Sequence, residues 1–205
     1  MIIVKDKFCY IHIPKTSGSS LTSILSPYIA KEHRKSKTRK EGMGWQDTWH
    51  IDHQHSFLNK HNITNINGLD VITIIRNPYS RIISFFNNFN RGKFSTFKEF
   101  LLTDSPSMCA YDKSLHQLPI IKNDFGIEVK WYKQEENAHY NICKDYGLKY
   151  IETELVVGAG DAIEKEKSIP YHRKNYSEYY DNESREIVAK KYAKDIEYFN
   201  YKFGE

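Results

Sequence analysis

The hydrophobic residues of this chain fall into short runs that are separated by longer amphipathic stretches. Residues 8–13 (FCYIHI) and 70–75 (DVITII) are rich in β-branched and aromatic residues, which is typical of buried strands. Residues 149–154 (KYIETE) predict a third strand. Because strands that alternate with helices favour parallel pairing, the pattern predicts an α/β fold: a three-layer parallel sheet flanked by helices.

Apolar residues at helical spacing predict the helices of this fold. One such stretch follows each of the first two strand runs after a loop or turn, and others lie further along the chain. The stretches are residues 21–29, 82–89, 95–103, 134–146 and 184–198. The second of these helices is expected to begin near Pro78 or Tyr79. Residues 104–130 contain two prolines and are predicted to be irregular.

Length and composition place the chain among soluble globular proteins. Its 205 residues fit one domain, predicted to span residues 1–205, with 40% hydrophobic and 27% charged residues. No run approaches the roughly 18 apolar residues of a membrane span. The first residues are too few and too polar for a signal peptide. These features predict a soluble, cytoplasmic protein without a membrane span.

Charge and cysteine content restrict the classes of ligand and cross-link that the chain is expected to have. The net charge of +4 suits an anionic ligand, and no nucleic-acid-binding motif is present. The three cysteines are Cys9, Cys109 and Cys143, which are far apart and odd in number. This usage predicts free thiols in a reducing compartment, and neither a disulfide framework nor a zinc site.

A loop of small and hydroxyl residues follows the first predicted strand and precedes a helix. Small residues let several backbone N–H groups turn toward one point, and a helix N-terminus favours an anion there. Lys15 adds a positive charge. Candidate anion-binding residues are Lys15, Thr16, Ser17, Gly18, Ser19 and Ser20. The loop is not a Walker A motif, whose lysine comes late, and an ordinary turn with a helix cap remains the alternative.

A second candidate for anion binding follows the DVITII strand. Arg76 comes at its carboxyl end, where α/β proteins place ligands, and Ser84 lies eight residues later on the predicted helix. A guanidinium matches the geometry of a phosphate, so the two side chains could bind one phosphate together. The alternatives are a surface charge at the strand end for Arg76 and a structural ion pair for Arg81.

Two motifs together resemble a known family. HIPKTSGSSL is similar to the 5′-phosphosulfate loop of the cytosolic and Golgi sulfotransferases, and IIRNPYSRIISFF is similar to their 3′-phosphate motif. The subgroup resembled is the carbohydrate type, which includes the heparan sulfate and uronosyl 2-O-sulfotransferases. The resemblance implies 3′-phosphoadenosine 5′-phosphosulfate (PAPS) as sulfuryl donor. It implies that Lys15 and residues 16–20 bind the 5′-phosphosulfate and that Arg76 and Ser84 bind the 3′-phosphate.

The segment WHIDHQHSFLN contains three histidines, of which two are candidates for a general base. The spacing of His50, His53 and His55 is not a standard zinc arrangement, so no metal is expected. Imidazole titrates near neutral pH and can accept a proton from an attacking hydroxyl. HQHSFLN resembles the HxH segment of the 2-O-sulfotransferases. This favours His55, then His53, as the base; surface or packing histidines are the alternative.

The C-terminal region offers two further cofactor contacts. Arg173 and Lys174 precede the last predicted helix, in a segment that resembles the basic loop that closes on PAPS in the same family. A solvated basic turn is the alternative for both residues.

The predicted activity is therefore in-line sulfuryl transfer from PAPS to an acceptor hydroxyl of a glycan or small metabolite. Lys15 would stabilise charge on the leaving phosphate. Two rival functions stay open: a P-loop-like nucleotide kinase and a non-catalytic nucleotide- or anion-binding module. Asp70 lies at the start of its predicted strand, whereas a kinase of that type would need a carboxylate at the strand end.

Overall fold

The computed structural model places two compact units, each assembled from two stretches of chain. The described residues are 2–4, 6–29, 66, 68–89, 94–103, 116–151 and 175–205. The first unit comprises Met1–Ile75 and Pro119–Ala159, and the second comprises Arg76–Leu118 and Gly160–Glu205. The single domain expected over the whole chain stays a prediction.

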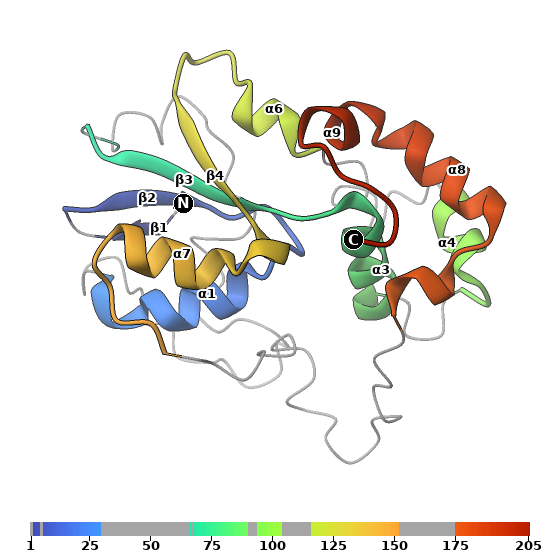
Figure 1. Ribbon diagram of the computed structural model, residues 1–205, viewed down its shortest axis with the longest axis horizontal. Helices are drawn as coiled ribbons and strands as arrows, with labels where there is room; N and C mark the ends of the chain where they lie inside the picture. The colour runs from blue at the N-terminus through green and yellow to red at the C-terminus, as the bar shows by residue number, and fades with distance from the viewer. Residues whose placement is uncertain are drawn as a thin grey trace, which may run out of the picture. The chain divides into compact units, whose positions relative to one another are not determined.

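The first unit is built on a four-stranded mixed sheet (Figure 1). Its strands are β1 (Ile2–Val4), β2 (Phe8–Ile11), β3 (Asp70–Ile75) and β4 (Val129–Lys133), in the spatial order β1-β2-β3-β4. β2 and β3 are parallel, as the sequence predicted; β4, which was not predicted, is parallel to β3, and β1 pairs antiparallel with β2. The carboxyl ends of β2 and β3 therefore lie at the same edge of the sheet.

Helices α1 (Gly18–Leu25) and α7 (Ala138–Asp145) cover one face of this sheet (Figure 1). Leu21, Ile24 and Leu25 of α1 join Ile142 and Cys143 of α7 in one hydrophobic cluster with the strands. Cys9 and Cys143 are buried free thiols, as predicted, and burial raises the pKa of Cys9 to about 11. The short helices of this unit are η1 (Ser26–Tyr28) and η3 (Gln134–Glu136).

Two strand assignments made from the sequence need correction. Residues 149–151, expected to begin a third strand, have no regular structure, and residues 152–154 lie outside the described part of the chain. The strand that pairs with β3 is β4, which begins inside the stretch predicted to be irregular. That stretch also contains α6 (Leu118–Ile121).

The second unit is helical, with an aromatic core. Its helices are α3 (Pro78–Phe89), α4 (Phe97–Leu102), α8 (Asn182–Lys191) and α9 (Ala193–Tyr198), together with η4 (Tyr176–Tyr179). The predicted helices at 82–89 and 95–103 are confirmed, and the predicted last helix is two helices that meet at Tyr192. The core side chains come from α3, α4 and α8; they include Tyr79, Phe85, Phe86, Phe97, Phe100, Val188 and Tyr192.

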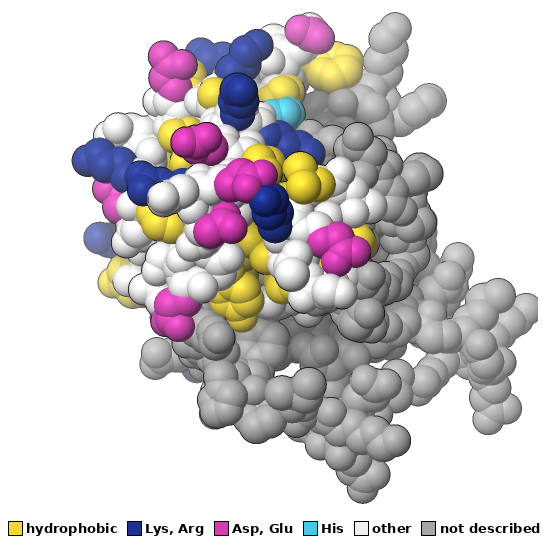
Figure 2. Space-filling model, turned by 90° about the vertical axis from the view of Figure 1, so that its right-hand side faces the viewer, with side chains coloured by type: hydrophobic (Ala, Val, Ile, Leu, Met, Phe, Trp, Pro, Cys, Tyr) yellow, Lys and Arg dark blue, Asp and Glu magenta, His cyan; other side chains and the backbone are white. Residues whose placement is uncertain are grey.

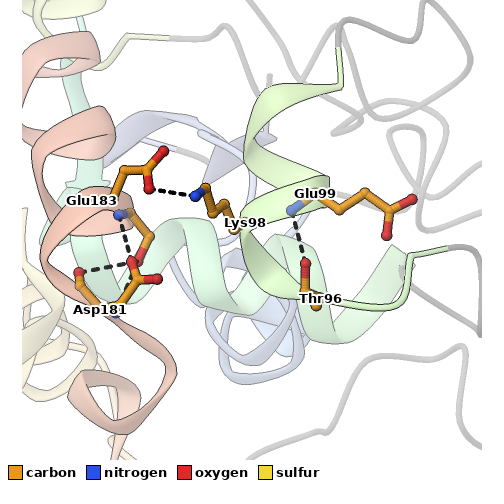
Figure 3. A network of polar contacts seen from close by, with 6 residues as sticks. Thr96, Lys98, Glu99, Asp181 and Glu183 are labelled. Atoms are coloured by element: carbon orange, nitrogen blue, oxygen red, sulfur yellow. Dashed lines mark hydrogen bonds and ion pairs between the residues drawn. The ribbon is translucent and has the colours of Figure 1, made fainter.

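Polar contacts cap α4 and α8, and one ion pair connects the two helices (Figure 3). Thr96 caps α4 by accepting from the Glu99 N–H, and Asp181 caps α8 by accepting from the Ser184 N–H. Lys98 pairs with Glu183 between the two helices. Figure 2 shows acidic and basic side chains interspersed on the face turned toward the viewer. Exposed ion pairs of this kind contribute little to stability.

None of the described helices is both long enough and apolar enough to cross a lipid bilayer.

Candidate functional site

The loop that joins β2 to α1 has an unusual backbone. Lys15 and Ser17 adopt positive φ angles of 62° and 65°, whereas Thr16 between them does not. A residue other than glycine in this region costs about 1–2 kcal/mol, so contacts around the loop must hold it in place. Alternation of this kind turns successive N–H groups toward one side and creates a concavity that can accept an anion.

Buried contacts on both flanks hold this backbone. The Thr16 hydroxyl donates to the Ile13 carbonyl at 2.7 Å, and Thr16 is fully buried. At position 18, an added Cβ would lie 2.1 Å from Cδ2 of the His12 ring. Glycine is therefore required at position 18 because the buried imidazole of His12 packs directly against the backbone.

His139, on the first turn of α7, contacts the same loop. Its Nε2 lies 3.0 Å from Ser17 Oγ and 3.2 Å from the Ser17 carbonyl oxygen. Partial burial lowers the pKa of His139 below its ordinary value of 6.5, and the contact with the Ser17 carbonyl opposes this shift. The imidazole is therefore neutral at physiological pH.

The first turn of α1 begins immediately after this loop. Ser17 is its N-cap residue, and the first bond into the helix runs from the Leu21 N–H to the Ser17 carbonyl. The Ser17 side chain does not cap the helix; its hydroxyl donates to the Thr16 carbonyl instead. N–H groups in a first turn need acceptors from outside the helix, and a bound anion can supply them.

In the second unit, Arg76 directly follows β3 in the chain and its backbone is held on both sides. The Arg76 N–H donates to Gln117 Oε1, and Gln117 Nε2 donates to the Arg76 carbonyl, both at 2.8 Å. The Asp195 carboxylate accepts from the N–H groups of Gln117 and Leu118 at 2.8 and 2.9 Å. Gln117 and Asp195 are fully buried. These hydrogen bonds hold the Arg76 backbone, and with it the point from which the side chain extends.

The guanidinium of Arg76 is oriented by the helix that follows. Its Nε donates to Ser80 Oγ at 2.9 Å, and the Ser80 hydroxyl donates to the Asn77 carbonyl at 3.2 Å. Ser84 lies one turn beyond Ser80 on α3 and is partly buried. Arg81 is almost fully buried with its guanidinium over the Phe85 ring, which fits a structural role.

Several predicted site residues lie outside the described part of the chain. These are the candidate bases His53 and His55 and the candidate cofactor contacts Arg173 and Lys174. The backbone of Ser19 is described as part of α1, but its side chain is not. Ser20 is buried in the same turn.

Four residues around these two elements escaped the sequence reasoning: His139, Ser80, Gln117 and Asp195. Ser80 could have been noticed, because it lies four residues after Arg76 and four before Ser84, on one helix face. The other three lie far from their partners in the sequence, and His139 is separated from Ser17 by 122 residues. No local pattern marks them.

The sheet, the loop and the helix that follows it define an α/β protein with a strand–loop–helix unit at the carboxyl edge of parallel strands. The sequence matches the model of the Sulfotransferase family over residues 1–202. The chain belongs to this sulfotransferase family, and sulfuryl transfer is the activity of such proteins. Neither the curated proteins nor the solved structures contain a match to the chain.

Proposed function

We propose that this protein transfers a sulfuryl group from PAPS to an acceptor hydroxyl. The observation that carries the proposal is the backbone of the loop at Lys15–Ser17, with its alternating φ angles ahead of α1, in a chain of the sulfotransferase family. The family match supports sulfuryl transfer in general, and the loop supports a donor with a phosphate-like group.

The loop is suited to the phosphosulfate end of the donor. A P-loop-like backbone offers N–H groups without requiring side chains to reorganise, and Lys15 adds a positive charge beside them. Thr16 and Ser17 direct their hydroxyls to main-chain carbonyls. These two hydroxyls shape the loop, so the proposed contacts are the amides from Ser17 to Ser20 and the Lys15 ammonium.

Arg76 is suited to the 3′-phosphate of the same donor. Ser80 holds its Nε, which leaves the guanidinium in one orientation and lowers the entropy lost on binding. Ser84 supplies a hydroxyl one turn further along α3. Arg173 and Lys174 complete the proposal on sequence grounds, as basic residues that would cover the bound nucleotide.

The proposed step is in-line displacement at sulfur. His55, or His53 in its place, accepts the proton of the acceptor hydroxyl while its oxygen forms a bond to sulfur. The bond between sulfur and the bridging oxygen breaks, and the leaving phosphate keeps the electron pair. Lys15 and the loop amides stabilise the charge that develops there. The resemblance to 2-O-sulfotransferases favours a glycan hydroxyl as acceptor.

A transfer assay with PAPS and a panel of glycans, phenols and alcohols tests this proposal. We expect sulfation of at least one acceptor, with release of 3′-phosphoadenosine 5′-phosphate. Substituting His55→Ala, or His53→Ala if His53 is the base, should lower turnover by about 10²–10⁴ while nucleotide binding persists. Thermal stabilisation by ATP·Mg²⁺ with none by 3′-phosphoadenosine 5′-phosphate would contradict the proposal. Nucleotide binding without transfer would favour a binding module.

A further inference from the structure

The contact between α7 and the loop has a defined direction. A serine hydroxyl carries one hydrogen, and that of Ser17 is donated to the Thr16 carbonyl at 2.5 Å. Toward His139, Ser17 Oγ can therefore act only as an acceptor. The Ser17 carbonyl oxygen is likewise an acceptor. Both contacts use the same ring nitrogen. It follows that Nε2 of His139 carries the hydrogen and donates to both Ser17 oxygens.

Ser17 is the residue at which the loop becomes a helix. Its carbonyl oxygen accepts from the Leu21 N–H at 3.2 Å as well as from His139, so two donors fix the peptide that joins Ser17 to Gly18. That peptide carries the Gly18 N–H, one of the first-turn groups available to an anion. Without the second donor, Ser17 would lose a contact that holds its left-handed conformation.

We propose that His139 is a positioning residue for the donor site: its Nε2–H fixes the peptide between Ser17 and Gly18 so that the first-turn amides of α1 bind the phosphosulfate. This inference rests on the proposed function. The ring acts through Ser17 and touches no reacting atom. It belongs to a part of the chain where neither HIPKTSGSSL nor IIRNPYSRIISFF lies, so it extends the site to α7.

The position of the donating nitrogen separates this role from simple packing. A glutamine side chain places an amide N–H where Nε2 of histidine lies, whereas asparagine reaches only the position of Nδ1. Phenylalanine keeps a ring of similar size and has no donor. If His139 merely fills space, phenylalanine should replace it best. If it positions the loop, glutamine should replace it best.

The experiment measures binding of 3′-phosphoadenosine 5′-phosphate by calorimetry to the whole chain and to His139→Gln, His139→Asn and His139→Phe. Tyr140→Phe is the matched control, because Tyr140 is the next residue on α7 and is exposed. Loss of the donor that shapes the loop should weaken binding by roughly three- to tenfold in the Asn and Phe variants. The Gln variant should stay within about twofold of the unsubstituted protein.

A second measurement needs no ligand. Long-range ¹H–¹⁵N spectra of the histidine rings, assigned by loss of a signal in His139→Gln, should show His139 as the Nε2–H tautomer. The Nδ1–H tautomer would overturn the inference. So would equal affinities across the three variants, or a Phe variant that binds better than the Gln variant, while nucleotide binding itself keeps the proposed function. An unsubstituted protein that fails to bind the nucleotide would overturn both.

Discussion

The loop from Lys15 to Ser20 and the turn that begins at Arg76 each follow a parallel strand, yet they use the chain differently. In the loop, the proposed binding group is the backbone: two residues have positive φ, and the hydroxyls of Thr16 and Ser17 donate to carbonyls. In the turn, the proposed binding group is the Arg76 guanidinium, and the backbone is held by Gln117.

The difference indicates which substitutions each element tolerates. A binding site made of backbone depends on shape, so it is sensitive to any neighbour that moves the chain, such as His12 or His139. A site made of one side chain depends on the charge and on the groups that orient it, such as Ser80.

The largest effect is expected in the second unit, from Asp195→Ala. The substitution leaves the buried Gln117 N–H and the part-buried Leu118 N–H without their acceptor, at about 1–3 kcal/mol for the buried group and less for the other. The free energy of unfolding in urea should fall by about 2–5 kcal/mol in total. Glu197→Ala, at an exposed position on the same helix, should change it by less than about 0.5 kcal/mol. Equal effects of the two substitutions would refute the role given to Asp195.

Arg76→Ala should abolish the preference for a 3′-phosphate. A hydrogen bond to a charged group contributes about 1.5–3 kcal/mol, so binding of 3′-phosphoadenosine 5′-phosphate should weaken at least about tenfold. Binding of 5′-AMP should not change. Arg76→Lys keeps the charge but loses the fork held by Ser80, and should fall between the two. Calorimetry with both nucleotides is the measurement; a parallel loss for 5′-AMP would show that Arg76 does not read the 3′-phosphate.

Gly18→Ala tests the shape dependence of the loop. The added Cβ would lie 2.1–2.2 Å from two atoms of the His12 ring. Overpacking of this kind typically costs about 1–3 kcal/mol, and it should appear in the urea midpoint. Combining it with His12→Ala should recover part of the loss, because the clash then disappears. Strict additivity of the two substitutions would mean that the ring does not constrain position 18.

The smallest effect concerns pH. The pKa of His139 in the folded chain is below 6.5, its value in the unfolded chain, because burial disfavours the imidazolium. Its contribution to stability is therefore complete above pH 6.5 and is lost as pH falls from 6.5 through the folded pKa.

His139→Gln, which has no titrating group there, isolates this contribution. The free energy of unfolding of the unsubstituted protein, minus that of this variant, should decrease as pH falls from about 7.5 to about 5. Other charged groups near His139 in the sequence, among them Glu136 and Lys144, are common to both proteins and cancel in the comparison. A constant difference across this range would contradict the buried, neutral imidazole.

Much of the fold can be predicted from local sequence patterns. The errors in that prediction have physical causes. DVITII predicted β3 correctly because a continuous β-branched run that is buried on both faces has few other interpretations. The sequence did not predict β4, which is the last strand in the order of the described sheet. Its residues Lys130 and Trp131 are exposed, so the run does not look hydrophobic. KYIETE alternates like a strand, but Tyr150 and Ile151 are exposed and have no regular structure.

The candidate site was predictable only where its residues are contiguous. Lys15 to Ser20, and the step from Arg76 to Ser84, are local motifs. The groups that hold them come from distant helices: His139 for the loop, and Asp195, 78 residues from Gln117, for the turn. A single histidine or aspartate on a helix has no sequence signature, because its partner is chosen by the tertiary fold.

We propose that the loop from Lys15 to Ser20 and Arg76 bind the same donor, the loop at its 5′-phosphosulfate and Arg76 at its 3′-phosphate. The most direct test is calorimetric titration of the unsubstituted protein with 3′-phosphoadenosine 5′-phosphate and with 5′-AMP under identical conditions. The account predicts at least about tenfold tighter binding of the bisphosphate, since Arg76 adds a charged hydrogen bond to the 3′-phosphate. Equal affinity for the two nucleotides would contradict it.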